Sequence, residues 1–352
     1  MDLEIMKKVF MIGKYLALTP TNPKDISPTR FHKFYAIFVF SCYALDTINS
    51  FYNRRSFYLK LSMMQVVLRV LLTTDLIANT FYSIIVACLL KRHKWSVLIK
   101  NLRVVENKSS TMRWYYFTFV ALHVLLLTMA ILTFYIWIEF FGVDFFKLYL
   151  GEYLQIYLLF FNNMATCIVL GLMLTRYRYQ NTLMSRLVTR KLLHLPLLTK
   201  VKNNLFVLRQ TVDAFNDLFG WSILFNIFFG GLRSLICFDV LFSFRGNGLG
   251  ANGLQMFFHL EVMLFHLIGM LTMILLCDTI RKEFEDLLLL FYKLDCNAEL
   301  STDENEMSAL IKSLSRNVPQ FTAARYFYID RSTILSLFNS ITTFILVMIQ
   351  FQ

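Results

Sequence analysis

Ionisable side chains interrupt several long apolar stretches of this sequence, and they are its strongest candidates for ligand-binding chemistry. Such groups are costly in an apolar environment, so their presence favours either a functional role or pairing between helices. Charged and polar groups can orient a bound small molecule, while aromatic groups can form apolar walls around it. Nine positions meet one of these descriptions: Asp75, His123, Tyr135, Trp137, Tyr157, Arg233, Asp239, His259 and Glu261.

The spacing of these residues does not indicate catalysis or metal binding. His259 and His266 are seven residues apart and share one helix face, whereas Glu261 points elsewhere. This pattern differs from the His-Glu-x-x-His sequence of zinc enzymes, and no nucleophile, base and orienting group are found together. The sequence therefore predicts a protein that is not an enzyme and that uses no cofactor or metal. Arg233 and Asp239 have a structural alternative, which is to pair with other helices.

The elements that must position these residues are membrane helices. Hydrophobic residues make up 57% of the 352 residues and charged residues only 16%, whereas soluble domains have about a quarter charged. The net charge of +12 does not indicate nucleic-acid binding, because the basic residues are spread over alternate loops and form no single patch. Membrane lipid is therefore the expected partner, and nucleic acid is not.

Seven apolar stretches are each about as long as the roughly 20 residues that a helix needs to cross a bilayer. Backbone amides in lipid must be hydrogen-bonded within the segment, so these stretches are expected to be helices and not strands. The sequence thus predicts an all-α polytopic membrane protein with spans at residues 34–52, 64–90, 114–138, 150–174, 218–243, 255–277 and 332–351.

The charges of the connecting loops predict the orientation of the chain. The loop at 91–113 carries seven Lys and Arg residues against one Glu, and the loop at 175–217 is also strongly basic. The loops around 139–150 and 244–254 carry few cations. Because basic loops remain in the cytoplasm, we expect a cytoplasmic N-terminus and an extracellular C-terminus. Arg54 and its neighbours in the first loop are an exception to this pattern.

Two long segments between the predicted spans have an apolar periodicity of their own. Residues 175–217 and 281–331 are rich in Leu with interspersed charge, and Leu205, Leu208 and Val212 recur at helical spacing. Amphipathic helices of this type bury their apolar faces against one another. We therefore expect helices that continue past the membrane and pack together in the cytoplasm.

The end of the chain carries the most specific pattern in the sequence. Residues 343–351 consist of Thr-Phe, five apolar residues and Gln-Phe. This run resembles the C-terminal signature of the insect gustatory receptor family, which is Thr-Tyr, five apolar residues and Gln-Phe. Segments 321–323 and 329–333 also resemble the lead-in to that family's seventh helix. Phe344 replaces the family's Tyr, which keeps the aromatic bulk and removes a hydroxyl.

The resemblance implies a tastant-gated, non-selective cation channel in the plasma membrane. The channel would be a homotetramer, or a heterotetramer with other gustatory receptor subunits. The resemblance also implies a cytoplasmic N-terminus at 1–33, and six spans at 34–280 with a ligand pocket in their outer half. A cytoplasmic anchor segment would follow at 281–331, and a pore-lining seventh helix at 332–352. The cytoplasmic helices would hold most of the contacts between subunits.

On the seventh helix, Thr343, Val347, Gln350 and Phe351 share one face at spacings of three and four residues. An apolar constriction beside a polar Gln, at the outer end of a pore helix, can close by dewetting and open when the helices separate. These four residues are the predicted pore and gate. The alternative is that Gln350 only caps an interfacial helix end.

Other classes of protein remain open on the sequence. An odorant receptor of the same superfamily is the nearest alternative. A G-protein-coupled receptor needs the opposite orientation, and a transporter usually has repeated halves with broken helices. The family's sugar-responsive members often carry an acidic residue just after the Thr-Tyr pair, whereas this chain has Ile345. The resemblance therefore favours a bitter or other non-sugar tastant.

Overall fold

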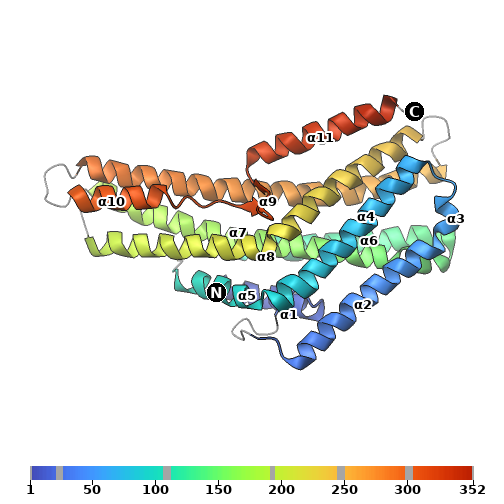
Figure 1. The fold of residues 1–352 in the computed structure, drawn as a ribbon, viewed down its shortest axis with the longest axis horizontal. Helices are drawn as coiled ribbons and strands as arrows, with labels where there is room; N and C mark the ends of the chain where they lie inside the picture. The colour runs from blue at the N-terminus through green and yellow to red at the C-terminus, as the bar shows by residue number, and fades with distance from the viewer. Residues whose placement is uncertain are drawn as a thin grey trace.

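The structure, a computed structural model, describes residues 2–20, 27–105, 112–190, 195–243, 250–297 and 304–350. Over these ranges the chain is built almost entirely of helices, with one small hairpin before the last of them (Figure 1). The elements in chain order are α1 (Asp2–Tyr15), α2 (Arg30–Asn53), α3 (Arg55–Tyr58), α4 (Met63–Phe81), the π-helix η1 (Tyr82–Leu90), α5 (Arg92–Val104), α6 (Met112–Phe141), α7 (Asp144–Arg190), α8 (Leu195–Ser243), α9 (Gly250–Asn297), α10 (Glu304–Ser315), β1 (Thr322–Ala323), β2 (Phe327–Tyr328) and α11 (Arg331–Gln350).

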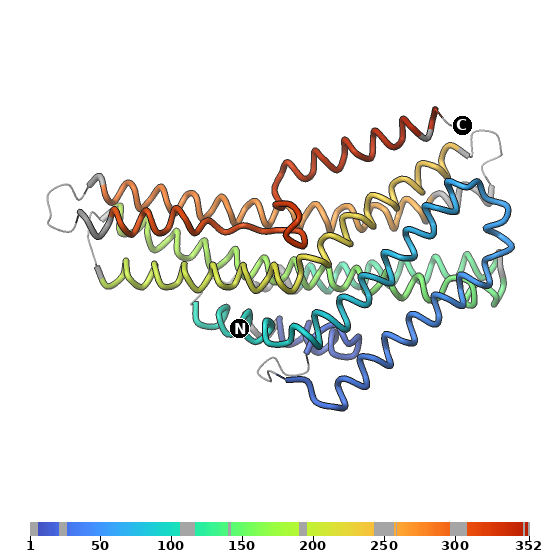
Figure 2. Tube along the Cα trace, in the orientation of Figure 1, coloured from blue at the N-terminus to red at the C-terminus, as the bar shows by residue number. Residues whose placement is uncertain are grey.

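Three helices of unusual length form the frame of the molecule. Helices α7, α8 and α9 contain 47, 49 and 48 residues. At 1.5 Å per residue each is about 70 Å long, roughly twice the thickness of the hydrocarbon core of a bilayer. They lie side by side along the long axis of the molecule, as Figures 1 and 2 show. Each therefore has one part that crosses a membrane and one part that extends beyond it.

The remaining helices divide the molecule into two halves. In one half, which we call the bundle, α2, α4, α6 and α11 surround the adjoining parts of α7, α8 and α9 (Figure 1). In the other half, which we call the extension, α10 accompanies the three long helices, and α5 packs against α8 where the two halves meet (Figure 1). Short helix α3 closes the far end of the bundle, and the end of α11 points toward the same end (Figure 1).

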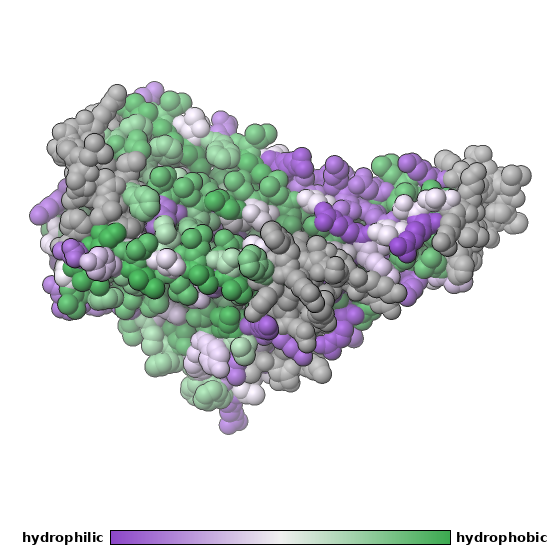
Figure 3. Space-filling model, turned by 180° about the vertical axis from the view of Figure 1, so that it is seen from behind, coloured by the Kyte–Doolittle hydropathy of each residue, from purple (hydrophilic) through white to green (hydrophobic). Residues whose placement is uncertain are grey.

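The surface of the bundle is apolar, as a membrane protein requires. Figure 3 shows hydrophobic residues covering most of its visible face, and hydrophilic residues gathered on the extension. Large apolar side chains such as Phe34, Ile131 and Leu335 are more than half exposed. Such a surface would aggregate in water and is instead covered by lipid. The chain is therefore a multi-pass α-helical membrane protein.

Each predicted span is helical wherever the structure describes it. Within the described ranges six segments are long and apolar enough to cross a membrane, and they lie in α2, α4 with η1, α6, α7, α8 and α9. A shorter apolar helix, Arg331–Val347, occupies most of the seventh predicted stretch. The predicted boundary between residues 280 and 281 falls inside α9, which continues without a break to Asn297.

The extension is held together by the predicted amphipathic faces. Leu187 of α7 and Leu205 and Leu208 of α8 are buried there, together with Ile311 and Leu314 of α10. Helix α7 ends at Arg190 and α8 begins at Leu195, so the following proline lies in the first turn of α8. Proline is tolerated at that position because the first amides of a helix have no intrahelical partner. The predicted packed helices are confirmed.

Candidate functional site

A cavity of about 50 Å³ lies in the bundle near α3. Side chains from α3, α4, α6, α7, α8 and α9 line it, and residue Arg54 between α2 and α3 completes it. Its walls are largely aromatic, formed by Phe57, Tyr58, Trp137, Phe145, Tyr149 and Tyr153, and its polar groups include Arg54, Arg69, Glu152, Arg233 and His259. An enclosed space with aromatic walls and a few convergent polar groups is typical of a small-molecule site.

Glu152 on α7 is the centre of the polar groups. Its Oε2 is 2.8 Å from Nη1 of Arg54, and its Oε1 is 3.9 Å from Nη1 of Arg233. The two arginines are 5% and 6% exposed. The guanidinium of Arg54 also lies over the ring of Tyr149 at 4.9 Å from the centroid. A buried carboxylate between two guanidiniums joins the end of α2 to α7 and α8, and removal of Glu152 would leave two buried cations unbalanced.

This arrangement explains one of the three cations that form the exception in the loop charges, whereas Arg55 and Lys60 are exposed. Arg54 follows the first span, where a cation on the extracellular side conflicts with the orientation that the other loops predict. The structure places Arg54 inside the protein, where Glu152 balances its charge. It is therefore a structural cation of the bundle and provides no information about orientation.

The structure brings three of the nine predicted site residues together at the cavity. Trp137, Arg233 and His259 line it, from α6, α8 and α9. The ring of Trp137 is stacked against Phe145 with centroids 6.3 Å apart. Tyr149 stacks on the other aromatic groups of this wall, at 5.6 Å from Phe145.

The other six predicted residues lie outside the lining of this cavity. His123 on α6 lies among aromatic rings, with Phe119 at 4.1 Å and Tyr157 at 6.3 Å between centroids. Asp239 on α8 accepts a hydrogen bond of 2.9 Å from Nε2 of Gln65. Asp75 is buried on α4. The remaining two are Tyr135, which is 65% exposed, and Glu261, which is half-buried on α9.

Three charged residues of the cavity, Arg54, Arg69 and Glu152, are absent from the predicted site. Arg54 lies in a predicted loop, and Glu152 lies at the start of an apolar stretch where charged residues are ordinary. The signal that could have found them is charge pairing, because a carboxylate within a predicted span requires a nearby cation. A single sequence does not show that Arg54 and Glu152 are partners, because 98 positions separate them along the chain.

A second polar cluster crosses the middle of the bundle. Ser222 of α8 donates a hydrogen bond of 2.9 Å to Oδ1 of Asn79 on α4. Asn162 of α7 donates to the same Ser222 and, at 3.4 Å, to Ser83 of η1. Hydrogen bonds of this kind join helices in lipid, where hydrophobic burial gives little drive for association. The cluster fixes α4, α7 and α8 relative to one another.

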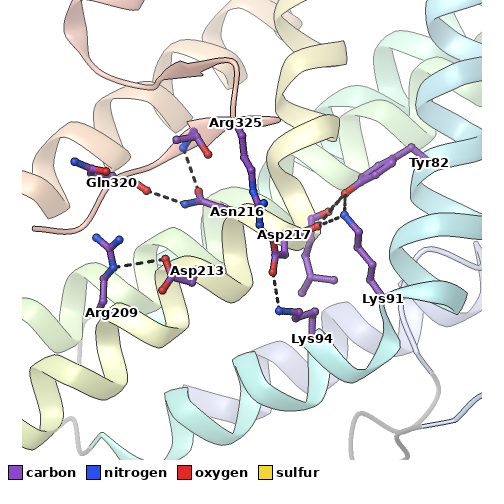
Figure 4. A network of polar contacts seen from close by, with 11 residues as sticks. Tyr82, Lys91, Lys94, Arg209, Asp213, Asn216, Asp217, Gln320 and Arg325 are labelled. Carbon is purple, nitrogen blue, oxygen red and sulfur yellow. Dashed lines mark hydrogen bonds and ion pairs between the residues drawn. The ribbon is translucent and has the colours of Figure 1, made fainter. Parts of the chain in front are cut away.

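A third polar network connects α8 to the segment before α11 (Figure 4). The carboxylate of Asp217 on α8 binds Nζ of Lys94 at 2.7 Å and Nη2 of Arg325 at 2.8 Å. The backbone oxygen of Asp217 accepts from Nζ of Lys91 at 2.6 Å and from the hydroxyl of Tyr82 at 3.1 Å. One residue of α8 thus contacts η1, α5 and the hairpin. Burial beside these cations lowers the pKa of the Lys91 ammonium.

The hairpin that precedes α11 is fastened directly to α8. Its strands pair antiparallel, with Thr322 opposite Tyr328. The amide of Thr322 donates to Oδ1 of Asn216 at 3.1 Å, and the amide of Ala324 donates to the backbone oxygen of Gly220 at 3.0 Å. Ala324 and its neighbour Arg325 have positive φ angles of 50° and 66°, which cost about 1–2 kcal/mol each for residues with a Cβ. Docking on α8 therefore maintains a turn that these residues disfavour.

Helix α11 packs against α8 and α9 and leaves its opposite face uncovered in the single chain. The predicted pore residues Thr343, Val347 and Gln350 are all exposed on it. The fourth, Phe351, lies outside the described residues. The exposed surface of α11 also includes Leu335, Phe338, Phe344, Leu346 and Ile349.

The long apolar helices, the internal polar cavity and the C-terminal helix with a free face define a multi-pass helical membrane protein with an internal site. The chain belongs to the 7tm Chemosensory receptor family, whose model matches residues 9–352. The expected relation to the insect chemoreceptor superfamily is thereby confirmed, and it places the chain among receptors and not among enzymes.

Solved structures give the same fold. The insect olfactory receptor OR5 from Machilis hrabei matches with a TM-score of 0.67 and 14% sequence identity, over 99% of this chain and 98% of that one. The structure of the same receptor in complex with eugenol matches with a TM-score of 0.62 and 14% identity, over 100% of both chains. No curated protein sequence gives a significant match.

Proposed function

We propose that the protein is a gustatory receptor, a non-selective cation channel of the plasma membrane that opens when a tastant binds. The observation that carries the proposal is the cavity near α3, a ligand-type site inside the bundle of a chain from a chemosensory receptor family. The proposal includes a cytoplasmic N-terminus and an extracellular C-terminus, in agreement with the basic loops. The cavity then lies in the outer half of the membrane.

The size of the cavity suggests how binding is coupled to opening. Ligand sites generally have volumes of about 300–1,000 Å³, whereas this cavity has about 50 Å³. A tastant therefore binds a state in which the lining helices have moved apart. A ligand that binds this expanded state more tightly shifts the population toward it. The olfactory receptor structure determined with eugenol supports a small organic molecule as the ligand.

Helix α11 is the proposed pore helix. Four copies of the chain, identical or mixed with related subunits, would place four exposed α11 faces around a common axis. Thr343, Val347, Gln350 and Phe351 would line the conduit, and the apolar residues would close it by dewetting. The amphipathic helices of the extension would form the anchor where the subunits meet. Substitution of Gln350 distinguishes this role from the alternative one, which is to cap the helix end.

The network around Asp217 is the proposed link between site and pore. Helix α8 carries Arg233 at the cavity, and Asp217 and Gly220 at the hairpin that leads into α11. A displacement of α8 on ligand binding would move this hairpin and the start of α11 together. Two arrangements of this hairpin would form the two-state element that a coupling mechanism requires.

An odorant receptor is the second candidate, and the matching olfactory receptor structures favour it. The Gln-Phe ending and the Ile-Asp-Arg sequence at 329–331 favour the gustatory branch, and Ile345 favours a bitter or other non-sugar tastant.

The test is to express this chain alone in cells and to record calcium entry during application of a panel of bitter compounds, sugars and volatile odorants. We expect entry with bitter compounds and none with sugars. Responses to volatile odorants alone would assign the chain to the odorant class. Absence of entry with every compound, from a chain shown to reach the cell surface, would contradict the channel function of a homomer.

A further inference from the structure

The side chains that line the cavity near α3 include more cations than anions. Arg54, Arg69 and Arg233 line it together with a single carboxylate, that of Glu152. Arg69 is half-buried with its guanidinium 5.5 Å from the ring centroid of Phe57, so it faces the same aromatic wall. Guanidinium groups keep their charge in proteins. Among the described lining residues the cationic groups therefore exceed the anionic ones by two.

Two of these cations have hydrogen-bond donors without an acceptor. Nη2 of Arg54 and Nε of Arg233 are both buried and have no partner within the part of the chain that the structure describes. The residues themselves are more than nine-tenths buried and line the cavity. A buried donor without an acceptor is destabilising, so sites of this kind usually hold a water, an ion or a ligand.

The two arginines differ in how firmly Glu152 holds them. Arg54 forms a hydrogen-bonded ion pair at 2.8 Å, and its Nε also donates to the backbone oxygen of Ser50 at 3.4 Å. Arg233 is 3.9 Å from the carboxylate, which is beyond hydrogen-bond distance. Its guanidinium is therefore the one that can present two parallel N–H groups to another acid.

We propose that this cavity recognises the acidic group of an organic anion, with Arg233 as the main anchor and Arg54 as a second donor. The proposal rests on the ligand-gated function and deepens it by naming the ligand class, an amphiphilic carboxylate or related oxyanion. The aromatic side chains of Tyr149, Tyr153 and Trp137 hold the apolar body of the ligand. A neutral ligand of the same shape leaves the extra positive charge uncompensated, and the site discriminates against it.

The sequence contains a matched control on the same helix as Glu152. Lys147 is a cation on α7 paired with Asp144 at 2.9 Å, but its side chain is 70% exposed and does not line the cavity. Lys147→Gln removes one positive charge from the same end of the molecule. It therefore separates a general effect of charge from recognition by the cavity.

The experiment measures thermal unfolding of the purified full-length chain in detergent, in buffers of constant sodium chloride. The probes are two matched pairs, benzoate with benzamide and cinnamate with cinnamamide. We expect each acid to raise Tm at a concentration at least about tenfold lower than its amide requires. This ratio corresponds to one charge-assisted hydrogen bond. The same titrations are performed on Arg233→Gln, Glu152→Gln and Lys147→Gln.

Arg233→Gln is expected to lose the preference for acids, and Lys147→Gln to keep it. For Glu152→Gln we expect two changes. Without ligand its Tm is lower than that of the unmodified chain, because two buried cations lose their counter-ion. With benzoate its Tm rises by more than that of the unmodified chain, because the acid replaces the missing carboxylate. A purely structural role of Glu152 would lower Tm without enlarging the response to the acid.

Several results would overturn the proposal. The proposal is wrong if acids and amides raise Tm equally, or if Arg233→Gln keeps the preference for acids. It is also wrong if neither acid raises Tm, or if chloride alone raises Tm as much as the acids do. Calcium entry in cells separates this proposal from the channel function. If acids bind but evoke no calcium entry, the result supports the anion site and contradicts the channel function. If only neutral compounds evoke calcium entry, the result supports the channel function and contradicts the anion site.

Discussion

Substitution of Gly220 by alanine is the sharpest test of the contact between α8 and the hairpin before α11. A Cβ at Gly220 would lie 3.0 Å from the amide nitrogen of Ala324 and 3.2 Å from the backbone oxygen of Thr322. Both atoms belong to the backbone and cannot rotate away as a flexible side chain would. The amide of Ala324 also donates to the oxygen of Gly220, so the hairpin cannot withdraw without weakening that bond.

The expected magnitude follows from three effects. Alanine is favoured over glycine inside a helix by about 1 kcal/mol. Overpacking against an unyielding neighbour costs about 1–3 kcal/mol. Loss of the hydrogen bond between Ala324 and Gly220 costs about 1 kcal/mol more. Gly220→Ala is therefore expected to lower the free energy of unfolding by about 1–3 kcal/mol in spite of its better helix propensity.

Gly231→Ala is the matched control in the same helix. A Cβ at Gly231 meets no heavy atom within 4 Å among the described residues, so only the helix propensity acts and stability should rise by up to about 1 kcal/mol. The assay is denaturant or thermal unfolding of both variants in detergent, with calcium entry recorded in parallel. We expect Gly220→Ala also to shift the ligand concentration for half-maximal entry. Equal stability of the two variants would refute the docking geometry.

Three further predictions concern the cap of α11, the pore and the cavity. Asp330→Ala should cost about 1 kcal/mol, because Asp330 accepts from the amide of Ser332 at 2.9 Å as a helix cap. The Ser332 hydroxyl holds the pKa of that carboxyl below its ordinary value of 3.8, so its stabilisation is full above that value. The variant and the unmodified chain should differ less in free energy of unfolding as the pH falls through the lowered pKa. A difference that does not change with pH would contradict the role of Asp330 as a cap. Gln350→Ala should change ion permeability ratios, whereas unchanged currents and ratios would remove it from the pore. Arg233→Ala should weaken the calcium response to a true ligand at least about tenfold. Glu261 lies outside the cavity lining, so Glu261→Ala should weaken the response less. A larger effect of Glu261→Ala would contradict the location of the site at this cavity.

The helices could be predicted from the sequence because their cause is local. Continuous apolar stretches of sufficient length must be helical in lipid whatever surrounds them, and the Leu periodicity beyond the spans determines which face is buried. The sequence of the last helix indicated the superfamily. The expectation that helices continue past the spans is confirmed at α9, which runs without a break across residue 281 to Asn297.

The contacts that form the site could not be predicted in this way. The pair of Arg54 and Glu152 depends on how α2 packs against α7, and neither residue has an unusual local sequence. The hairpin before α11 was also missed, because its turn has Ala324 and Arg325 at positive φ, where glycine or asparagine would give the usual signal. That conformation is imposed by docking on α8, which is a tertiary effect.

The most direct test of the central claim is to reconstitute the purified chain into a planar lipid bilayer and to record currents during application of a ligand that stabilises it in solution. We expect ligand-dependent cation currents whose permeability ratios change when Gln350 of α11 is replaced by alanine. A well-folded, ligand-binding protein that passes no current would contradict the proposed channel, and currents that persist with unaltered selectivity after that substitution would contradict the proposed pore lining.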